Sequence, residues 1–172
     1  TMRTTVDGVY AVGDAAESYS LITGAPLWRP LGSTANKMGR IAGDAITGGN
    51  LTHRGILGTG IVRVFELAVG HTGLSETEAN AQGFDVEVVH NIKPAHATYI
   101  GGRELLIKAI ADRGTGRLLG AQAIGPQGVD KRIDVLATAI SLGASAEDLF
   151  HLDLAYSPPF ATTKDPIHYT GM

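Results

Sequence analysis

The chain of 172 residues contains no cysteine, and several other absences narrow its function. Without cysteine it forms no disulfide, and no thiol nucleophile acts from within it. No apolar run approaches the roughly 20 residues that a membrane-spanning helix needs. The net charge of −3 provides no electrostatic basis for binding nucleic acid or an anionic membrane. We therefore expect neither nucleic acid nor membrane as a partner.

The six histidines are too scattered to predict a metal site. No two of them lie four residues apart, the spacing that places two ligands on one face of a helix, and no carboxylate cluster accompanies them. A Gly-x-Ser-x-Gly string is also missing, although a catalytic triad assembled only in space would leave no such mark. The sequence therefore predicts no bound metal.

The heptapeptide Gly-Val-Tyr-Ala-Val-Gly-Asp at residues 8–14 predicts a short apolar strand that ends in Gly-Asp. Ligands of open α/β sheets bind at the carboxyl ends of strands. Gly13 has no Cβ and so admits a ligand close to the backbone, and the carboxylate of Asp14 can accept hydrogen bonds from sugar or polyol hydroxyls. By spacing alone, an ordinary turn residue at a strand end explains Asp14 equally well.

A helix is predicted from about residue 34 to residue 47, because small and apolar side chains recur there at helical spacing. Ser33 or Thr34 is expected to cap its start, and Gly48 to end it. The character of the sequence changes after residue 50, and the following residues 51–172 predict an α+β fold in which helices pack on an antiparallel sheet.

Strands and helices are both expected in this second part. The expected strands cover residues 60–69 (with a phase shift near Phe65), 84–88, 105–111 and 118–124. Two short helices are predicted by the capping-box pairs Ser75 with Glu78 and Ser145 with Asp148. A longer helix begins near Val129, places Arg132 among its polar residues and stops at Gly143.

Together these motifs resemble one family, the FAD-dependent pyridine nucleotide-disulfide oxidoreductases. The similar segments, in chain order, are residues 8–14, 29–32, 35–40, 58–65, 72–76 and 156–160. The family's N-terminal Gly-x-Gly-x-x-Gly motif, nicotinamide domain and redox cysteine have no counterpart here. The resemblance implies the C-terminal part of a longer cytoplasmic enzyme. Residues 1–50 would be a remnant of the FAD-binding α/β domain, and residues 51–172 the interface domain that makes these enzymes homodimers.

The resemblance also implies flavin-binding residues in the first part. Asp14, after Gly13, would hold the ribityl chain of FAD. The helix start would offer free N–H groups and a positive dipole end to a flavin carbonyl. The residues implied there are Pro30, Leu31, Gly32, Ala35 and Asn36. Ordinary capping and packing account equally well for any single one of them.

Glutathione-reductase-like relatives carry a His-Pro where this chain has Tyr156 and Ser157. Tyrosine at this place is similar to the coenzyme A-disulfide reductase, NADH oxidase and persulfide reductase subgroup. In that subgroup two tyrosines reach the active site of the partner subunit, which implies catalytic roles for Tyr156 and, less directly, Tyr99. The alternative for Tyr156 is an aromatic side chain packed on Pro158 and Pro159.

The function implied is electron transfer from NAD(P)H through FAD to a disulfide, persulfide or polysulfide, with coenzyme A as a further ligand. The chain alone is expected to be inactive. One alternative is an NADH oxidase or peroxidase of the same architecture, and another is a module that only associates with itself. The tail residues Lys164, Asp165 and His168 are interpreted as solvated charges and a surface histidine.

Overall fold

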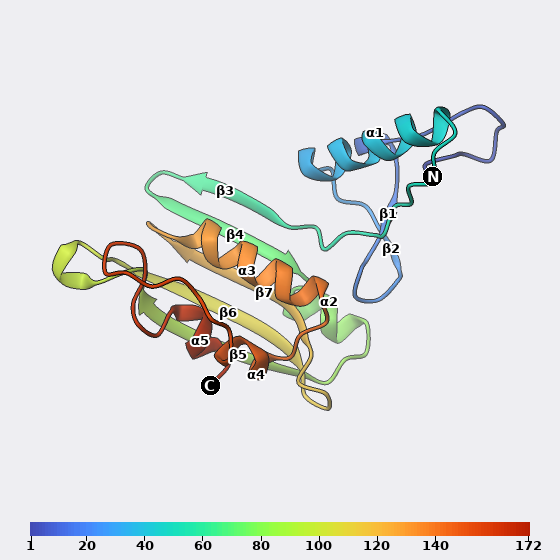
Figure 1. Ribbon diagram of the computed structural model, residues 1–172. Coiled ribbons are helices and arrows are strands. Elements are labelled where there is room, and N and C mark those ends of the chain that lie inside the picture. The colour runs from blue at the N-terminus through green and yellow to red at the C-terminus, as the bar shows by residue number, and fades with distance from the viewer. The chain divides into compact units, whose positions relative to one another are not determined.

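The computed structural model describes residues 1–172 and shows two compact units, residues 1–58 and residues 59–172 (Figure 1). The boundary lies eight residues after the expected one, since residues up to Gly58 contact the first unit. The N–H of Ile56 donates to the carbonyl oxygen of Tyr19, and the two atoms lie 2.9 Å apart. The imidazole of His53 lies 2.6 Å from the hydroxyl of Ser18.

The first unit contains η1 (Gly13–Ala15), β1 (Ser18–Tyr19), β2 (Pro26–Leu27) and α1 (Gly32–Ile46). The predicted helix is confirmed, but it starts at Gly32, and neither Ser33 nor Thr34 caps it. The strand predicted for residues 8–14 is wrong. One isolated bridge joins Arg3 to Tyr10, no ladder forms, and residues 13–15 are the helical turn η1.

The second unit is built on a five-stranded sheet in which every pair of neighbours is antiparallel. Its order is β3-β4-β7-β6-β5. The strands are β3 (Gly60–Val64), β4 (Leu67–Gly73), β5 (Val86–Pro94), β6 (Glu104–Asp112) and β7 (Leu118–Gly125). The phase shift near Phe65 is the turn between β3 and β4, where Phe65 adopts a φ of 52°. The α+β fold expected from the sequence is confirmed.

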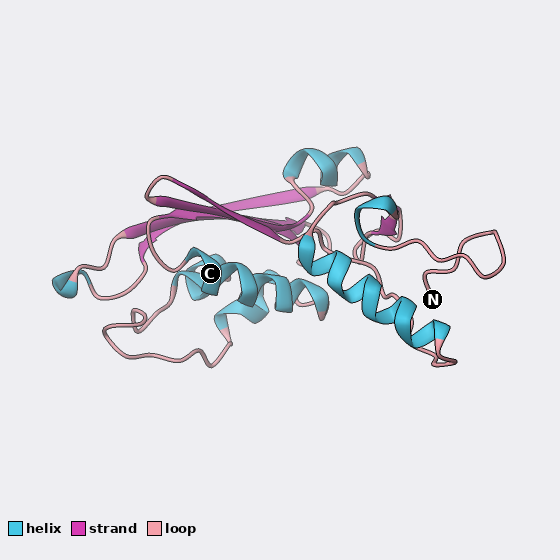
Figure 2. Cartoon of the chain, turned by 90° about the horizontal axis from the view of Figure 1, so that it is seen from above, coloured by secondary structure: helices cyan, strands magenta, loops and turns pink.

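Helices complete the second unit. They are α2 (Glu76–Ala81), η2 (Thr98–Ile100), α3 (Val129–Ser141), α4 (Ala146–Phe150) and α5 (Pro166–Thr170). Figure 2 shows α3 and the C-terminal helices on one face of the sheet, and α3 packs against β4 and β7. Side chains of β6, β7 and α3 form the core, among them Ile107, Leu118 and Leu136, all fully buried. None of these helices combines the length and the apolar character that a membrane span requires.

Both predicted capping boxes are confirmed. The hydroxyl of Ser75 accepts from the N–H of Glu78, whose carboxylate accepts from the N–H of Ser75, and the same reciprocal pair joins Ser145 and Asp148. Hydrogen bonds from the Ser145 backbone and hydroxyl hold the pKa of Asp148 below its usual range. These local patterns needed no tertiary context, which is why the sequence was sufficient to predict them.

Candidate functional site

The flavin-binding residues expected in the first unit gather where η1 meets the start of α1. Gly13 has a φ of +65°, and a Cβ added there would lie 3.3 Å from the Cβ of Ala35. The carboxylate of Asp14 is exposed, while its backbone oxygen accepts a 3.0 Å hydrogen bond from the indole N–H of Trp28. The close approach and the left-handed backbone both require glycine at position 13.

The first turn of α1 is open to an outside acceptor. Leu31 is its N-cap, no side chain caps it, and Pro30, Gly32 and Asn36 are exposed. The first N–H groups of a helix lack partners within the helix and carry its positive dipole end. The exposed Asp14 carboxylate can accept from hydroxyl groups, and the uncapped helix start can donate to carbonyl oxygens. This combination, next to Gly13, fits a ligand that has both hydroxyls and carbonyls, as FAD has.

Tyr99 and Tyr156 belong to two neighbouring loops of the second unit. Tyr99 lies in η2 and is 78% exposed, whereas Tyr156 lies between α4 and α5 and is 52% exposed. The loops are joined by a hydrogen bond from the N–H of Ala97 to the carbonyl oxygen of Pro158, 3.2 Å apart. Both phenols therefore remain available to a molecule that approaches from outside the unit.

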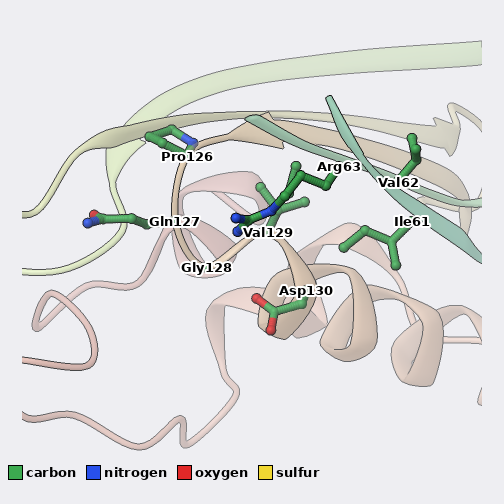
Figure 3. Close-up of a pocket in the computed structure, with 9 residues that line it drawn as sticks. Ile61, Val62, Arg63, Pro126, Gln127, Gly128, Val129 and Asp130 are labelled. Carbon is green, nitrogen blue, oxygen red and sulfur yellow. The ribbon is translucent and has the colours of Figure 1, made fainter. Parts of the chain in front are cut away.

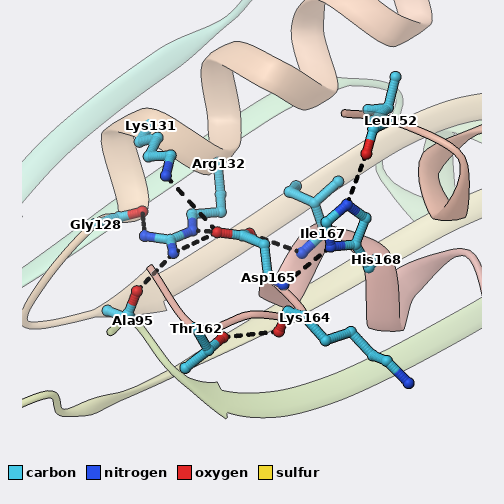
Figure 4. A network of polar contacts seen from close by, with 10 residues as sticks. All are labelled: Ala95, Gly128, Lys131, Arg132, Leu152, Thr162, Lys164, Asp165, Ile167 and His168. Atoms are coloured by element: carbon cyan, nitrogen blue, oxygen red, sulfur yellow. Dashed lines mark hydrogen bonds and ion pairs between the residues drawn. The ribbon is translucent and has the colours of Figure 1, made fainter. Parts of the chain in front are cut away.

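Figure 4 shows a polar network that joins α3 to residues flanking these two loops. The guanidinium of Arg132, which is 1% exposed, donates to both carboxylate oxygens of Asp165 at 3.2 and 2.7 Å and to the carbonyl oxygen of Ala95. His168 bonds to the N–H of Asp165 and to the carbonyl oxygen of Leu152, each at 2.9 Å. The polar-face position expected for Arg132 and the solvated charge expected for Asp165 are therefore wrong, whereas His168 is half-buried with both ring nitrogens bonded.

The helical spacing around Arg132 could have predicted that this side chain is buried. Counted from Val129, position 132 falls on the same helical stripe as Ile133 and Leu136, which are both buried. An arginine on an apolar stripe needs a buried anion, and Asp165, the N-cap of α5, supplies one 33 positions along the chain. Nothing local in the sequence connects the two, so the network emerges only in the folded unit.

Two hollows lie on the second unit, and neither contains a predicted site residue. Figure 3 shows a cavity of about 300 Å³ between the β3–β4 hairpin and the start of α3, which is lined by Ile61, Val62, Arg63, Ala68, Pro126, Gln127, Gly128, Val129 and Asp130. A groove of about 410 Å³ runs along α3, with lining residues that include Val135, Leu142, Leu152 and Leu154. Leu142 is 81% exposed at the end of this groove.

The five-stranded antiparallel sheet, with α3 and the C-terminal helices on one face, defines residues 59–172 as a small α+β domain. The family model for the pyridine nucleotide-disulphide oxidoreductase dimerisation domain matches residues 60–166, and the chain belongs to this family. The family resemblance read from the sequence is thereby confirmed.

Relatives of the chain have names that concern sulfur chemistry. It is 45% identical to the NAD(P)H sulfur oxidoreductase (CoA-dependent) of Pyrococcus furiosus, over 96% of this chain and 38% of the relative. It is 42% identical to the NAD(P)H coenzyme A polysulfide/persulfide reductase of Pyrococcus horikoshii, over 96% of this chain and 37% of the relative. The structure of an NAD-dependent persulfide reductase from A. fulgidus superposes with a TM-score of 0.96 at 38% identity, covering 99% of this chain and 32% of that chain.

Proposed function

We propose that the chain is part of a longer cytoplasmic flavoprotein, which transfers electrons from NAD(P)H through FAD to a disulfide, persulfide or polysulfide. The observation that carries this proposal is the similarity, over almost the whole chain, to relatives named for sulfur or persulfide reduction. Those relatives are more than twice as long as the chain. The thiol and the nicotinamide site of the proposed activity would therefore lie in other parts of the protein.

The first unit would bind one end of the flavin. FAD, when bound, supplies the redox centre between the nicotinamide and sulfur. The Asp14 carboxylate would accept hydrogen bonds from the ribityl hydroxyls, and Gly13 leaves room for that chain against the backbone. The uncapped N–H groups at Gly32 and the next residues would donate to a flavin carbonyl.

The second unit would supply two phenols to the sulfur chemistry. A phenol has a reference pKa of about 10, so near neutral pH it donates a proton more readily than it accepts one. The O–H of Tyr156 would donate to the thiolate that leaves when the S–S bond breaks, and Tyr99 on the adjacent loop would steady the same sulfur. A positioned general acid typically contributes about 10²–10⁴-fold to a rate.

A homodimer is part of this proposal, with the groove along α3 as the contact between the two copies. The matched family model describes a dimerisation domain, and the groove lies inside the matched residues. Its lining is mainly aliphatic, and Leu142 stands 81% exposed beside it. Apolar patches of this kind on a soluble domain mark association sites.

The tyrosine role is tested in the longer protein by Tyr156→Phe, which deletes the O–H and keeps the ring. We expect kcat for reduction of coenzyme A disulfide to fall by about 10²–10⁴-fold, with FAD content unchanged. Tyr10→Phe, in the first unit, is the matched control and should leave turnover intact. Unaltered turnover in Tyr156→Phe removes this residue from the mechanism.

Flavin binding is tested by Asp14→Ala, measured as the FAD-to-protein absorbance ratio after purification. The exposed Asp7, in the turn immediately before the heptapeptide of residues 8–14, provides the control Asp7→Ala. We expect loss of FAD only from Asp14→Ala, because Asp14 belongs to η1, which contacts α1. Full yellow colour in Asp14→Ala contradicts its role.

Two other functions are outcomes of these tests. NADH consumption with oxygen or peroxide in place of a disulfide would identify an oxidase or peroxidase. A purified 172-residue chain that dimerises in light scattering, but binds neither FAD nor coenzyme A in titrations, would act as an association module. Leu142→Lys should dissociate the dimer, while Phe65→Lys, at an even more exposed apolar position on the β3–β4 turn, should not.

A further inference from the structure

The segment from Leu152 to Asp165, which carries Tyr156, connects α4 to α5 without any helix or strand of its own. Tyr156 and Phe160 are exposed on it, so the segment gains little from burying its larger side chains. A long irregular segment holds one conformation only where its polar contacts fix it. Its position must therefore be set by polar contacts, which lie at its two ends and at Pro158.

One imidazole bonds both ends. The Nε2 of His168 lies 2.9 Å from the carbonyl oxygen of Leu152, and its Nδ1 lies 2.9 Å from the backbone nitrogen of Asp165. A carbonyl oxygen only accepts, so Nε2 carries the proton and Nδ1 offers its lone pair to the Asp165 N–H. A single neutral tautomer thus satisfies both bonds, and the ring joins the two ends of the segment, Leu152 and Asp165 (Figure 4).

The Asp165 end is in turn fixed to α3 and to the other tyrosine loop. Arg132 binds the Asp165 carboxylate and also donates to the carbonyl oxygen of Ala95, which precedes the loop of Tyr99. That loop contacts the segment directly through the Ala97 N–H and the Pro158 carbonyl oxygen. The closed segment and the Tyr99 loop therefore share one buried anchor.

We propose that His168 is a positioning residue, which holds Tyr156 in place beside Tyr99 by joining Leu152 to Asp165. The proposal rests on the proposed role of Tyr156 in sulfur chemistry. His168 acts through the backbone of the segment and does not touch the substrate. The bond to Leu152 is the decisive one, because the bond to Asp165 alone would make His168 only a local cap of α5.

Two substitutions at position 168 test the hydrogen bonds to Leu152 and to Asp165 separately. In His168→Gln the side-chain amide nitrogen takes the place of Nε2 and can still donate to Leu152. In His168→Asn the amide oxygen takes the place of Nδ1 and can still accept from Asp165, but the side chain is too short to reach Leu152. Positioning predicts that Gln rescues and Asn fails, whereas a helix cap predicts that both rescue, because the amide oxygen of either side chain can accept from the Asp165 N–H. His151→Asn, at an exposed histidine next to Leu152, is the matched control.

The first readout is ¹⁹F NMR of the 172-residue chain labelled with fluorotyrosine, whose five tyrosines are assigned by Tyr→Phe variants. We expect the Tyr156 signal to move to the position of an unfolded tyrosine in His168→Asn and to stay in place in His168→Gln and His151→Asn. Tyr10 and Tyr19, in the first unit, are internal references, and far-UV circular dichroism reports folding independently. An unchanged Tyr156 signal in His168→Asn, or an equal change in His168→Gln, overturns the proposal.

The second readout is turnover in the longer flavoprotein. A misplaced catalytic group costs up to about 10²-fold in rate, so His168→Asn should lower kcat by about 10-fold to 100-fold with KM for NAD(P)H unchanged. If Tyr156→Phe lowers turnover and His168→Asn does not, the positioning role is wrong while the proposed function stands. If Tyr156→Phe leaves turnover intact, the proposed role of Tyr156 fails, and the NMR result still decides whether His168 holds the segment.

Discussion

The two units of the chain differ in how they bury apolar side chains. The second unit places β6, β7 and α3 around a continuous core that includes Ile107, Ile110 and Leu119. The first unit has strands of two residues each, and its buried apolar side chains are mainly those of one face of α1 and Ile56. Many of its large apolar side chains are exposed, namely Val6, Val9, Val12, Leu21, Trp28, Ile46 and Leu51.

This difference shows that the candidate residues of the two units are supported by cores of different size. The tyrosine loops are anchored to a core with its own stability, through a buried ion pair. The flavin-binding residues are held by one helix and a few backbone contacts. Burial of apolar surface is the main source of folding stability, so substitutions should cost much more in the second unit.

The largest effect is expected from Arg132→Ala in the second unit. It leaves the Asp165 carboxylate buried, with only Lys131 nearby at 3.8 Å, and an uncompensated buried charge costs about 3–5 kcal/mol. Arg40→Ala, at an exposed position of α1, should change stability by less than about 0.5 kcal/mol. Urea denaturation followed by circular dichroism measures both. Equal effects would mean that the buried pair contributes nothing to the contrast between the units.

A matched pair of isoleucines tests the contrast without charge. Ile107→Ala removes a side chain that is 0% exposed and should cost about 2–5 kcal/mol through the lost burial and the cavity left behind. Ile46→Ala, at 63% exposure near the end of α1, should be close to neutral. The same denaturation experiment decides. A large loss in Ile46→Ala would show that the first unit has a core that includes this residue.

The sequence predicted the second unit better than the first, and the reason lies in the range of the interactions. The hairpin of β6 and β7 and both capping boxes depend on residues close in the chain, and their patterns could be recognised directly. The expected strand over residues 8–14 depends on pairing with neighbouring strands, and its apolar residues alone could not show that only residues 2–4 pair with it.

The candidate site shows the same limit. Gly13, Asp14 and the start of α1 were predicted as a group, and the structure brings them together in the first unit. The adjacency of the loops of Tyr99 and Tyr156 could not be derived from spacing, because 57 positions separate the two residues. The network of Arg132, Asp165 and His168 was missed, since charged residues are usually solvated and only the fold reveals the burial of Arg132 and Asp165.

The smallest expected effect is a pH dependence that separates the units. Burial, the charge of the N-terminus and Lys37 lower the pKa of His53 from its usual 6.5, so the folded first unit resists protonation of this ring. The unfolded chain takes up the proton first, and the stability of this unit is therefore fully present above about pH 6.5 and declines as the pH falls. Asp148 in the second unit also has a lowered pKa, from 3.8, so its contribution is lost only at much more acidic pH.

Amide hydrogen exchange between pH 7 and pH 5 measures this difference, after correction for the intrinsic effect of pH on exchange. Protection of the Ile56 N–H, which bonds to Tyr19, should fall with pH, while protection in β6 and β7 should stay constant. In His53→Gln the side chain cannot take up a proton, so the fall at Ile56 should disappear even if its protection is lower throughout. A fall that persists in His53→Gln would assign the acid sensitivity of the first unit to another group and leave His53 as a packed, non-titrating partner of Ser18.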